Sequence, residues 1–251
     1  MNAGSPLFSI VTATFNSMKD LPALQESLDS QTFTDFEWIV QDGASSDGTV
    51  EFLASVARPY LSYESESDRG IYDAFNRSLE RVEGRFVLFL GSDDYLASPT
   101  VLAELASAIS ASSEEPAVVL GGARTGDADI FESRLGLITL AINSVHHQGA
   151  LYRRDIFDDF RYDLTVPVIA DYELNVLLYK RRATVLQTGI LIAECGAEGI
   201  SQTSNEMALY KGMHLLRRRH VGWPTSFAFY LVGIANVVRR GRSAGKAPAN
   251  A

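Results

Sequence analysis

The chain has 251 residues, 46% of them hydrophobic and 21% charged, so it can bury the core of one large α/β domain or two small ones and is excluded from the disordered classes. The net charge of −9 is unevenly distributed, because eight basic residues and no acidic residue follow Glu206. The acidic body argues against nucleic acid as a partner, and a single cysteine, Cys195, excludes an intrachain disulfide and fits a reducing, cytoplasmic compartment.

The first hundred residues alternate strand-like and helix-like segments. Short apolar runs rich in β-branched and aromatic residues predict strands, and apolar residues at helical spacing predict helices. In chain order, strands are expected at 8–11, 36–40, 60–63 and 86–90, and helices around 21–28, 50–56 and 71–79. This alternation implies right-handed βαβ units around a largely parallel sheet, whose ligands bind at the carboxyl ends of the strands.

The alternation weakens in the second half of the chain. A helix is expected around 101–105 and a strand at 118–120, followed by a helix around 172–179 and a strand around 185–192. We therefore divide the chain into one domain at 1–206, with halves 1–100 and 101–206, a basic and apolar helical tail at 207–240, and a disordered end at 241–251.

An aspartate, Asp42, follows the strand that ends at Val40. A carboxylate in this place can accept hydrogen bonds from a nucleobase or a ribose hydroxyl, and the glycines that follow let the backbone approach a ligand closely. The segment also fits a turn that leads into a helix with Asp47 as its N-cap. From the residues alone, the turn is the favoured interpretation.

Two adjacent acids, Asp93 and Asp94, follow the strongest predicted strand. In a chain without a Cys or His cluster, such a pair suits a hard divalent cation, which takes one or two carboxylates together with phosphate oxygens. The alternative is a polar loop in which Asp94 or Ser98 caps the next helix. We favour the metal, because two neighbouring negative charges at a strand end are unfavourable without a counter-ion.

Four motifs occur in a fixed order: SIVTATFN at 9–16, DGASSDGT at 42–49, DRGIYDAFN at 68–76 and SDD at 92–94. Together they resemble the family 2 glycosyltransferases with the GT-A fold, and within them the bacterial exopolysaccharide branch of colanic-acid type. The resemblance is dense over 7–100, looser over 140–195 and absent beyond. It implies a Rossmann-like, mostly parallel sheet flanked by helices, with a nucleotide-binding half at 1–100 and an acceptor-binding half at 101–206.

The resemblance also implies which side chains bind a nucleotide-sugar donor. Those around the base and ribose are Thr12, Ala13, Thr14, Asn16, Asp42 and Asp93, and those flanking the nucleotide are Asp68 and Arg69. Asp94 would bind the Mn²⁺ or Mg²⁺ that bridges the diphosphate. Asp42 would contact the nucleobase, with uracil and hence a UDP-sugar favoured and a guanine nucleotide as the alternative.

The acceptor-binding half must supply a base, because inverting transfer needs a carboxylate that takes the proton of the acceptor hydroxyl. The family places this base just before a late helix, and Ala170-Asp171-Tyr172 matches that pattern. Asp171 is therefore the candidate and Glu173 the fallback. The alternative is that Asp171 only caps a helix that begins at Tyr172.

Two histidines precede the apolar residues 150–152. If this segment is a strand, neighbouring side chains face opposite sides, so at most one histidine reaches the site. Relatives with a His-Gln pair here nominate His147 for contact with phosphate or acceptor, although a structural histidine fits equally well. Cys195 is expected to be a buried small residue rather than a nucleophile, because no base motif accompanies it.

The tail has basic clusters at 217–220 and 239–242 on either side of an apolar run at 221–238, which Pro224, Gly233 and Asn236 interrupt. Arginines at both ends fit a helix lying in an anionic membrane interface better than one that crosses it. A core helix or an oligomer helix with a basic rim is the alternative.

The sequence thus predicts a peripheral enzyme on the inner face of the plasma membrane, acting on a glycan or lipid-linked acceptor in exopolysaccharide or cell-surface polysaccharide biosynthesis. A non-catalytic nucleotide-sugar-binding protein of a polysaccharide assembly complex is the other hypothesis. The oligomeric state is not predicted.

Overall fold

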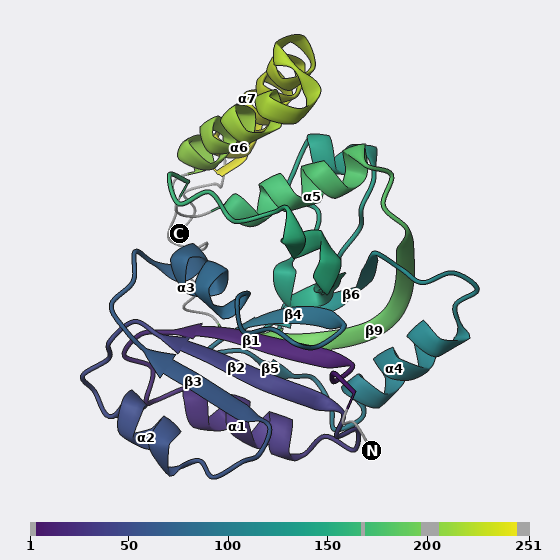
Figure 1. Cartoon of the computed structure of the whole chain (residues 1–251). Helices are drawn as coiled ribbons and strands as arrows, with labels where there is room; N and C mark the ends of the chain where they lie inside the picture. The colour runs from purple at the N-terminus through teal and green to yellow at the C-terminus, as the bar shows by residue number, and fades with distance from the viewer. Residues whose placement is uncertain (1–3, 167–168, 197–205, 245–251) are drawn as a thin grey trace, which may run out of the picture.

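The computed structural model describes residues 4–166, 169–196 and 206–244, in which helices cover both faces of a curved sheet (Figure 1). In chain order the elements are β1 (Phe8–Thr14), α1 (Leu21–Asp29), β2 (Phe36–Asp42), α2 (Thr49–Ser55), β3 (Leu61–Ser65), α3 (Ile71–Ser78), β4 (Phe86–Gly91), β5 (Tyr95–Leu96), α4 (Val101–Ala111), β6 (Val118–Thr125), β7 (Phe131–Glu132), the 3-10 helices η1 (Leu137–Leu140) and η2 (His147–Gly149), β8 (Ala150–Arg153), the 3-10 helix η3 (Arg154–Asp158), α5 (Ala170–Lys180), β9 (Val185–Cys195), α6 (Glu206–Val221) and α7 (Trp223–Ala244).

The strands lie in the order β3-β2-β1-β4-β8-β6-β9-β5, with β7 beside β6. β1, β2, β3 and β4 are parallel to one another, whereas the short β5 runs antiparallel to β9. β8 runs antiparallel between β4 and β6, whereas β9 is parallel to β6. The mostly parallel sheet is confirmed, and the carboxyl ends of β2, β1 and β4 meet at one edge of it.

Alternate residues of the central strands enter two different cores. Ile10 of β1 packs on the side of α1, α2 and α4, whereas its neighbour Val11 packs on the side of α3 and α5. The same division separates Leu88 from Phe89 on β4. Because both faces are covered, these strands are continuous apolar runs rather than alternating ones, which explains their strong signal in the sequence.

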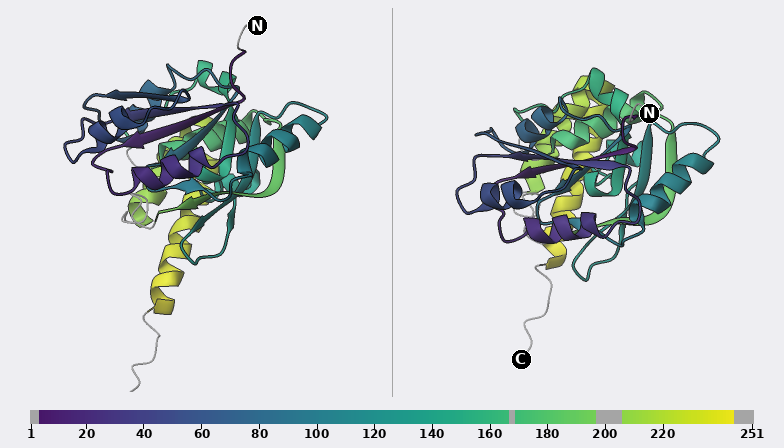
Figure 2. Two further views of the ribbon diagram at one scale, coloured as in Figure 1. Left: turned by 90° about the horizontal axis from the view of Figure 1, so that it is seen from below. Right: turned by 60° about the horizontal axis from the view of Figure 1, so that its bottom comes forward.

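The tail folds as two helices rather than as one helix around a central apolar run. α6 ends at Val221, Gly222 adopts a left-handed φ of 79°, and α7 begins at Trp223 with Pro224 in its first turn. α7 extends well away from the body of the protein (Figure 2). It continues to Ala244, so disorder from 241 is wrong for 241–244, and residues 245–251 lie outside the described residues.

Gly233 does not interrupt α7 but lies where this helix contacts α6. A Cβ at this position would overlap the ring of Tyr210, so only a glycine allows the two helices to approach so closely. Across the described residues, none of the helices combines the length and apolar character required to cross a membrane.

One member of the first basic cluster of the tail, Arg217, lies inside the protein, whereas Arg218 and Arg219 are exposed. The Arg217 side chain is fully buried, and it donates hydrogen bonds to the carbonyl oxygen of Leu140, to the Tyr172 hydroxyl (3.1 Å) and to the carbonyl oxygen of Ser226 (3.2 Å). Arg217 therefore joins α6 to η1, α5 and α7. The expectation that the arginines at this end of the apolar run face a membrane is wrong for Arg217.

Candidate active site

The loops that follow β1 and β2 are connected by hydrogen bonds between side chains and backbone. The Asn16 amide donates to Ser45 Oγ at 2.7 Å, and Asn16 Oδ1 accepts from the Ser46 amide at 3.0 Å. The Met18 amide donates to Asp47 Oδ2 at 3.0 Å. Asn16 has a positive φ of 51°, a conformation that L-residues rarely adopt and that is enriched at ligand sites. Asn16 thus fixes the corner where a nucleotide is expected.

Asp42 organises the same corner from the end of β2. It is fully buried, and its carboxylate accepts hydrogen bonds from the Ser45 amide (2.9 Å), the Ser45 hydroxyl (2.5 Å) and the Ser65 hydroxyl (2.6 Å). These contacts are those of the turn interpretation. Contact between Asp42 and a nucleobase stays a prediction.

The three residues at the end of β1 differ in their environment. Thr12 lies in the core, where its hydroxyl accepts a hydrogen bond from the Trp38 indole N–H at 3.0 Å, so it does not line a ligand surface. Ala13 packs toward the opposite core. Thr14 lies opposite Asp42, and its buried hydroxyl has no partner among the described residues. A buried hydroxyl without a partner is unfavourable, so Thr14 is the member of this trio best placed to bind a ligand.

An exposed aromatic ring, which the sequence analysis did not single out, lies beside this corner. The Phe15 side chain is 63% exposed. A Cβ on Gly43 would lie 3.3 Å from the Phe15 ring and 3.0 Å from the Asp68 carboxylate, so the glycine lies between the two. The signal in the sequence was a large apolar residue placed directly after the end of a buried strand.

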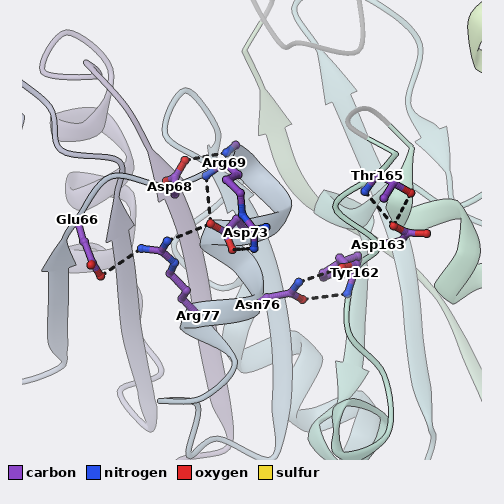
Figure 3. A network of polar contacts seen from close by, with 10 residues as sticks. Glu66, Asp68, Arg69, Asp73, Asn76, Arg77, Tyr162, Asp163 and Thr165 are labelled. Carbon is purple, nitrogen blue, oxygen red and sulfur yellow. Dashed lines mark hydrogen bonds and ion pairs between the residues drawn. The ribbon is translucent and has the colours of Figure 1, made fainter.

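The segment after β3 presents a cationic side chain, that of Arg69 (Figure 3). The Arg69 side chain is 74% exposed and approaches Asp73 at 3.4 Å, while Arg77 pairs with Asp73 at 3.0 Å. Burial raises the pKa of Asp73, but the Arg69 amide and the two guanidinium groups outweigh burial and lower that pKa overall. Asp68 accepts a hydrogen bond from the Gly70 amide at 2.8 Å, and contact of Asp68 and Arg69 with a nucleotide stays a prediction.

Asn76, the last residue of the same motif, joins the two halves of the domain. Its side-chain amide donates to the carbonyl oxygen of Tyr162 and accepts from the Tyr162 amide, each at 2.9 Å (Figure 3). α3 is therefore anchored to the backbone of the second half of the domain.

Asp93 and Asp94 lie between two glycines, at the ends of β4 and β9. The Gly91 amide donates to Asp94 Oδ2 at 2.6 Å, and the Gly196 amide donates to Asp94 Oδ1 at 3.2 Å. A Cβ on Gly91 would lie 3.0 Å from both carboxylates, and one on Gly196 would overlap Asp93. The N-cap residue of α4 is Thr100, so Asp94 does not cap this helix.

This acidic pair fits a divalent cation that is bound by carboxylate and by diphosphate oxygens together. No group of three or more His, Cys, Asp or Glu side chains converges as a metal site anywhere in the described residues. The chain would thus supply the hard carboxylate of Asp94 and leave the other positions to phosphate oxygens and water, as Mg²⁺ sites usually do, while contact of Asp93 with the ribose stays a prediction. Burial and the adjacent carboxylates raise the pKa of the Cys195 thiol, which keeps it neutral and a poor ligand for such an ion.

The candidate base, Asp171, is the second residue of α5, whose N-cap is Ile169, so it does not cap the helix. It is buried, and its carboxylate accepts hydrogen bonds from the Tyr72 hydroxyl and from Asn143 Nδ2, each at 3.1 Å. His147 Nδ1 lies 3.9 Å from Asp171 Oδ2. Burial alone raises the pKa of Asp171, but these three neighbours outweigh it and hold the pKa below its ordinary value. The carboxylate is therefore ionised near neutral pH, as a base must be.

The two histidines lie before β8 rather than within a strand, so the strand alternation does not apply to them. His147 is the one beside Asp171, whereas His146 stacks on the Phe131 ring with centroids 4.2 Å apart. Burial and His147 lower the pKa of His146, against an opposing effect of the Asp171 and Asp94 carboxylates. The negative charges of Asp171, the candidate base, and of Asp94, the candidate metal ligand, therefore both affect the pKa of His146.

The chain is similar to several known glycosyltransferases. A relative named PGL/p-HBAD biosynthesis glycosyltransferase, from Mycobacterium bovis (strain BCG / Pasteur 1173P2), is 32% identical over 199 residues, which cover 72% of this chain and 73% of the relative. Staphylococcus aureus TarS 1-349 in complex with UDP-GlcNAc aligns with a TM-score of 0.69 at 21% identity, over 83% of this chain and 65% of that one. The mannosyltransferase PcManGT from Pyrobaculum calidifontis, in complex with GDP-Man and Mn²⁺, aligns with a TM-score of 0.58 at 16% identity, over 94% and 76%.

The structural likenesses confirm the GT-A type fold that the order of the motifs predicted. The model of the family described as "Glycosyl transferase family 2" matches residues 9–219, which include every motif and every candidate site residue described above. The chain belongs to glycosyl transferase family 2.

Proposed function

We propose that this glycosyltransferase transfers a sugar from a nucleotide diphosphate sugar to an acceptor hydroxyl with inversion at the anomeric carbon, and that it depends on Mn²⁺ or Mg²⁺. The observation that carries the proposal is the buried, ionised carboxylate of Asp171, which accepts hydrogen bonds from Tyr72 and Asn143. An inverting transfer requires a base of this kind, together with positive charge beside the leaving diphosphate.

In this proposal, Asp171 takes the proton from the acceptor hydroxyl as the acceptor oxygen attacks the anomeric carbon. The bond from that carbon to the diphosphate oxygen breaks, and the nucleoside diphosphate leaves with the electron pair. A bound cation held by Asp94 would supply positive charge beside the diphosphate. Attack from the face opposite the leaving group inverts the configuration.

A UDP-sugar is the favoured donor. The corner formed by Thr14, Phe15, Asp42 and Asp68 combines an unpartnered buried hydroxyl, an exposed ring and two carboxylates, which suits a base and a ribose. TarS was crystallised with UDP-GlcNAc, whereas PcManGT was crystallised with GDP-Man, so a guanine nucleotide is the alternative. Arg69, 74% exposed, would lie beside the base or the phosphates.

We further propose that the acceptor is lipid-linked or a glycan at the inner face of the plasma membrane, as part of cell-surface polysaccharide biosynthesis. Leu137 and Ile138 of η1 are 64% and 47% exposed, and they flank the segment that ends in Asn143 beside Asp171. Trp223, Phe227 and Leu231 of α7, at helical spacing, are 55%, 37% and 50% exposed. Apolar side chains at these two places could contact a lipid or a membrane interface, in a chain region that is basic by sequence.

The other candidate function is a nucleotide-sugar-binding protein without turnover. It needs the same donor pocket but gives no role to the contacts that keep Asp171 ionised, so these contacts favour the enzyme.

A thermal-shift screen with UDP-GlcNAc, UDP and GDP-mannose, each with and without Mn²⁺, tests the proposal, because a specific ligand raises Tm by mass action. We expect a nucleotide to raise Tm only with Mn²⁺ present, and we expect the nucleotide sugar with that base to release its nucleoside diphosphate. Stabilisation without release would favour the binding protein, and no stabilisation by any of the three would contradict both hypotheses.

A further inference from the structure

The carboxylate of Asp171 is held by neutral hydrogen-bond donors from two separate parts of the chain. The Tyr72 hydroxyl comes from the first turn of α3 and bonds Oδ1, whereas Asn143 Nδ2 comes from the loop before η2 and bonds Oδ2. Each oxygen thus accepts one of these bonds, and the lone pairs that remain can take a proton from an acceptor. The orientation of the carboxylate is therefore set from both sides.

The Asn143 amide is itself oriented by a further set of buried groups. Its Oδ1 accepts a hydrogen bond from Asn175 Nδ2 at 3.3 Å, which leaves the Asn143 amide nitrogen to face Asp171. Asn175 in turn accepts a hydrogen bond from the Tyr152 hydroxyl at 3.2 Å. A connected chain of polar groups therefore runs from β8 through α5 to the candidate base.

Tyr72 stays a donor at any pH at which the protein works. Burial, and then the negative charge of Asp171, raise the pKa of Tyr72 well above its ordinary value. A neutral donor stabilises the ionised form of a carboxylate without cancelling its charge, so a group that accepts this hydrogen bond remains a base.

We propose that Tyr72 and Asn143 are positioning residues that orient Asp171 toward the acceptor and keep it ionised. The inference rests on the proposed role of Asp171 as the base. Tyr72 lies two residues after Gly70, directly beyond the segment with Asp68 and Arg69. One turn of α3 thus connects the expected donor loop to the base, and donor binding and proton transfer share a rigid element.

Several other titratable groups also act on Asp171 or are acted on by it, so they bear on any pH dependence. They are Tyr72 on α3, His146 and His147 around η2, Tyr152 on β8, and Tyr162 before α5. The three tyrosines have raised pKa values because they are buried, so they stay neutral, whereas burial lowers the pKa of His146.

Two substitutions in the full chain test the inference. Tyr72→Phe keeps the ring that packs on Tyr162 and removes only the hydroxyl. Asn143→Asp is nearly isosteric and replaces the donor by a second carboxylate about 3 Å from Asp171, so the pair must share a proton. Tyr60→Phe is the matched control, because it removes an equivalent hydroxyl-to-carboxylate bond, to Asp29, on the surface far from the site.

The first readout is the pKa of the Asp171 carboxyl, followed by ¹³C NMR and assigned with Asp171→Asn. We expect an upward shift of about one pH unit in Tyr72→Phe, a larger one in Asn143→Asp, and none in Tyr60→Phe. This measurement does not need turnover, so it remains informative if the proposed function fails. An unchanged pKa in both site variants would overturn the inference.

The second readout is nucleoside diphosphate release from UDP-GlcNAc or GDP-mannose, whichever stabilises the protein with Mn²⁺, followed against pH. We expect kcat to fall about tenfold or more at pH 6 in Asn143→Asp and to recover as the pH rises to 8, with the donor KM unchanged. A general loss of structure would not recover with pH. Loss of kcat that is equal at both pH values, or a pKa shift without any change in kcat, would contradict the positioning role.

Discussion

Asp171 and Glu173 lie two residues apart in the first turn of α5, and their carboxylates point to different partners. Asp171 bonds Tyr72 and Asn143, whereas Glu173 Oε1 lies 2.8 Å from His220 Nε2 of α6. Successive residues on an α-helix are separated by about 100°, so side chains two positions apart face in very different directions. The sequence offered both acids as candidate bases, and their surroundings favour Asp171.

Asp171→Asn should bind a donor normally and lose transfer, because the amide cannot take a proton. We expect kcat to fall on the order of a thousandfold, while calorimetry shows an unchanged affinity for the donor. Glu173→Gln is the matched control and should keep most of its turnover while weakening the contact between α5 and α6. Comparable losses of kcat in both variants would place the base elsewhere.

Asp94→Asn should abolish Mn²⁺-dependent donor binding, because the carboxylate proposed to bind the metal loses its charge. Isothermal titration with UDP-GlcNAc or GDP-mannose, with and without Mn²⁺, measures the effect. Asp127→Asn, at an exposed position in the turn after β6, serves as the control for a lost negative charge. An unchanged Mn²⁺ dependence in Asp94→Asn would show that this carboxylate is not a metal ligand.

Arg217→Met should destabilise the protein strongly, because the carbonyl oxygens of Leu140 and Ser226 would lose a buried donor. We expect the free energy of unfolding in urea to drop by about 3 kcal/mol. Arg218→Met changes the neighbouring exposed arginine and should shift it by less than about 0.5 kcal/mol. Equal effects would mean that burial of Arg217 does not matter for stability.

Asp163 should make stability fall in acid. Hydrogen bonds from Thr165 and Arg219 lower its pKa to about 2 in the folded protein, below the ordinary unfolded value of about 4. Its stabilising effect is therefore complete above pH 4 and is lost as the pH falls toward 2. Asp163→Asn should lower the free energy of unfolding by about 1 kcal/mol at pH 7, with less difference from wild type at pH 3.

The matched control is Asp159→Asn, at an exposed ion pair with Arg181. Such surface pairs contribute little, so this variant should resemble wild type at both pH values. A difference between Asp163→Asn and wild type that grew toward pH 3 would contradict the sign of the predicted effect.

Phe227→Ser combined with Leu231→Ser should reduce sedimentation with vesicles that contain anionic phospholipid, if α7 contacts a membrane. Both side chains are exposed, so neither change should affect the core. Val185→Ser, at a similarly exposed apolar residue at the start of β9, is the control. Equal sedimentation of all three proteins would exclude this part of α7 from membrane binding. Truncation after Glu206 is a poorer test, because it also removes Arg217.

The parts of the fold that depend on local pattern were predictable. The strands at 8–11 and 86–90 are apolar on both faces, and the acids directly after strand ends could be placed at one edge of a parallel sheet without knowledge of the other contacts. Asp171 could be predicted because the motif around it is short and contiguous. Its distance in sequence from α3 left the Tyr72 bond out of reach, since that bond spans 99 residues.

The errors arose where a long-range partner decides the environment of a residue. Thr12 belongs to the first motif, but its hydroxyl accepts a hydrogen bond from Trp38 on the neighbouring strand β2, so it lies in the core. Arg217 appeared to be one of several surface arginines, and nothing in the local sequence indicates that Tyr172 and the carbonyl oxygen of Leu140 are arranged to accept its hydrogen bonds.

Asn76 makes two hydrogen bonds to Tyr162 with its side chain, and Tyr162 takes part in both with main-chain atoms only. Any amino acid except proline would present the same amide and carbonyl groups, but the Tyr162 ring is buried against Tyr72, Phe75 and Phe89, so its side chain cannot change without disturbing the core. Asn76→Ala, in contrast, would remove the two hydrogen bonds and leave the rings in place, so this substitution would separate polar anchoring from aromatic packing as the force that holds α3 to the second half of the chain.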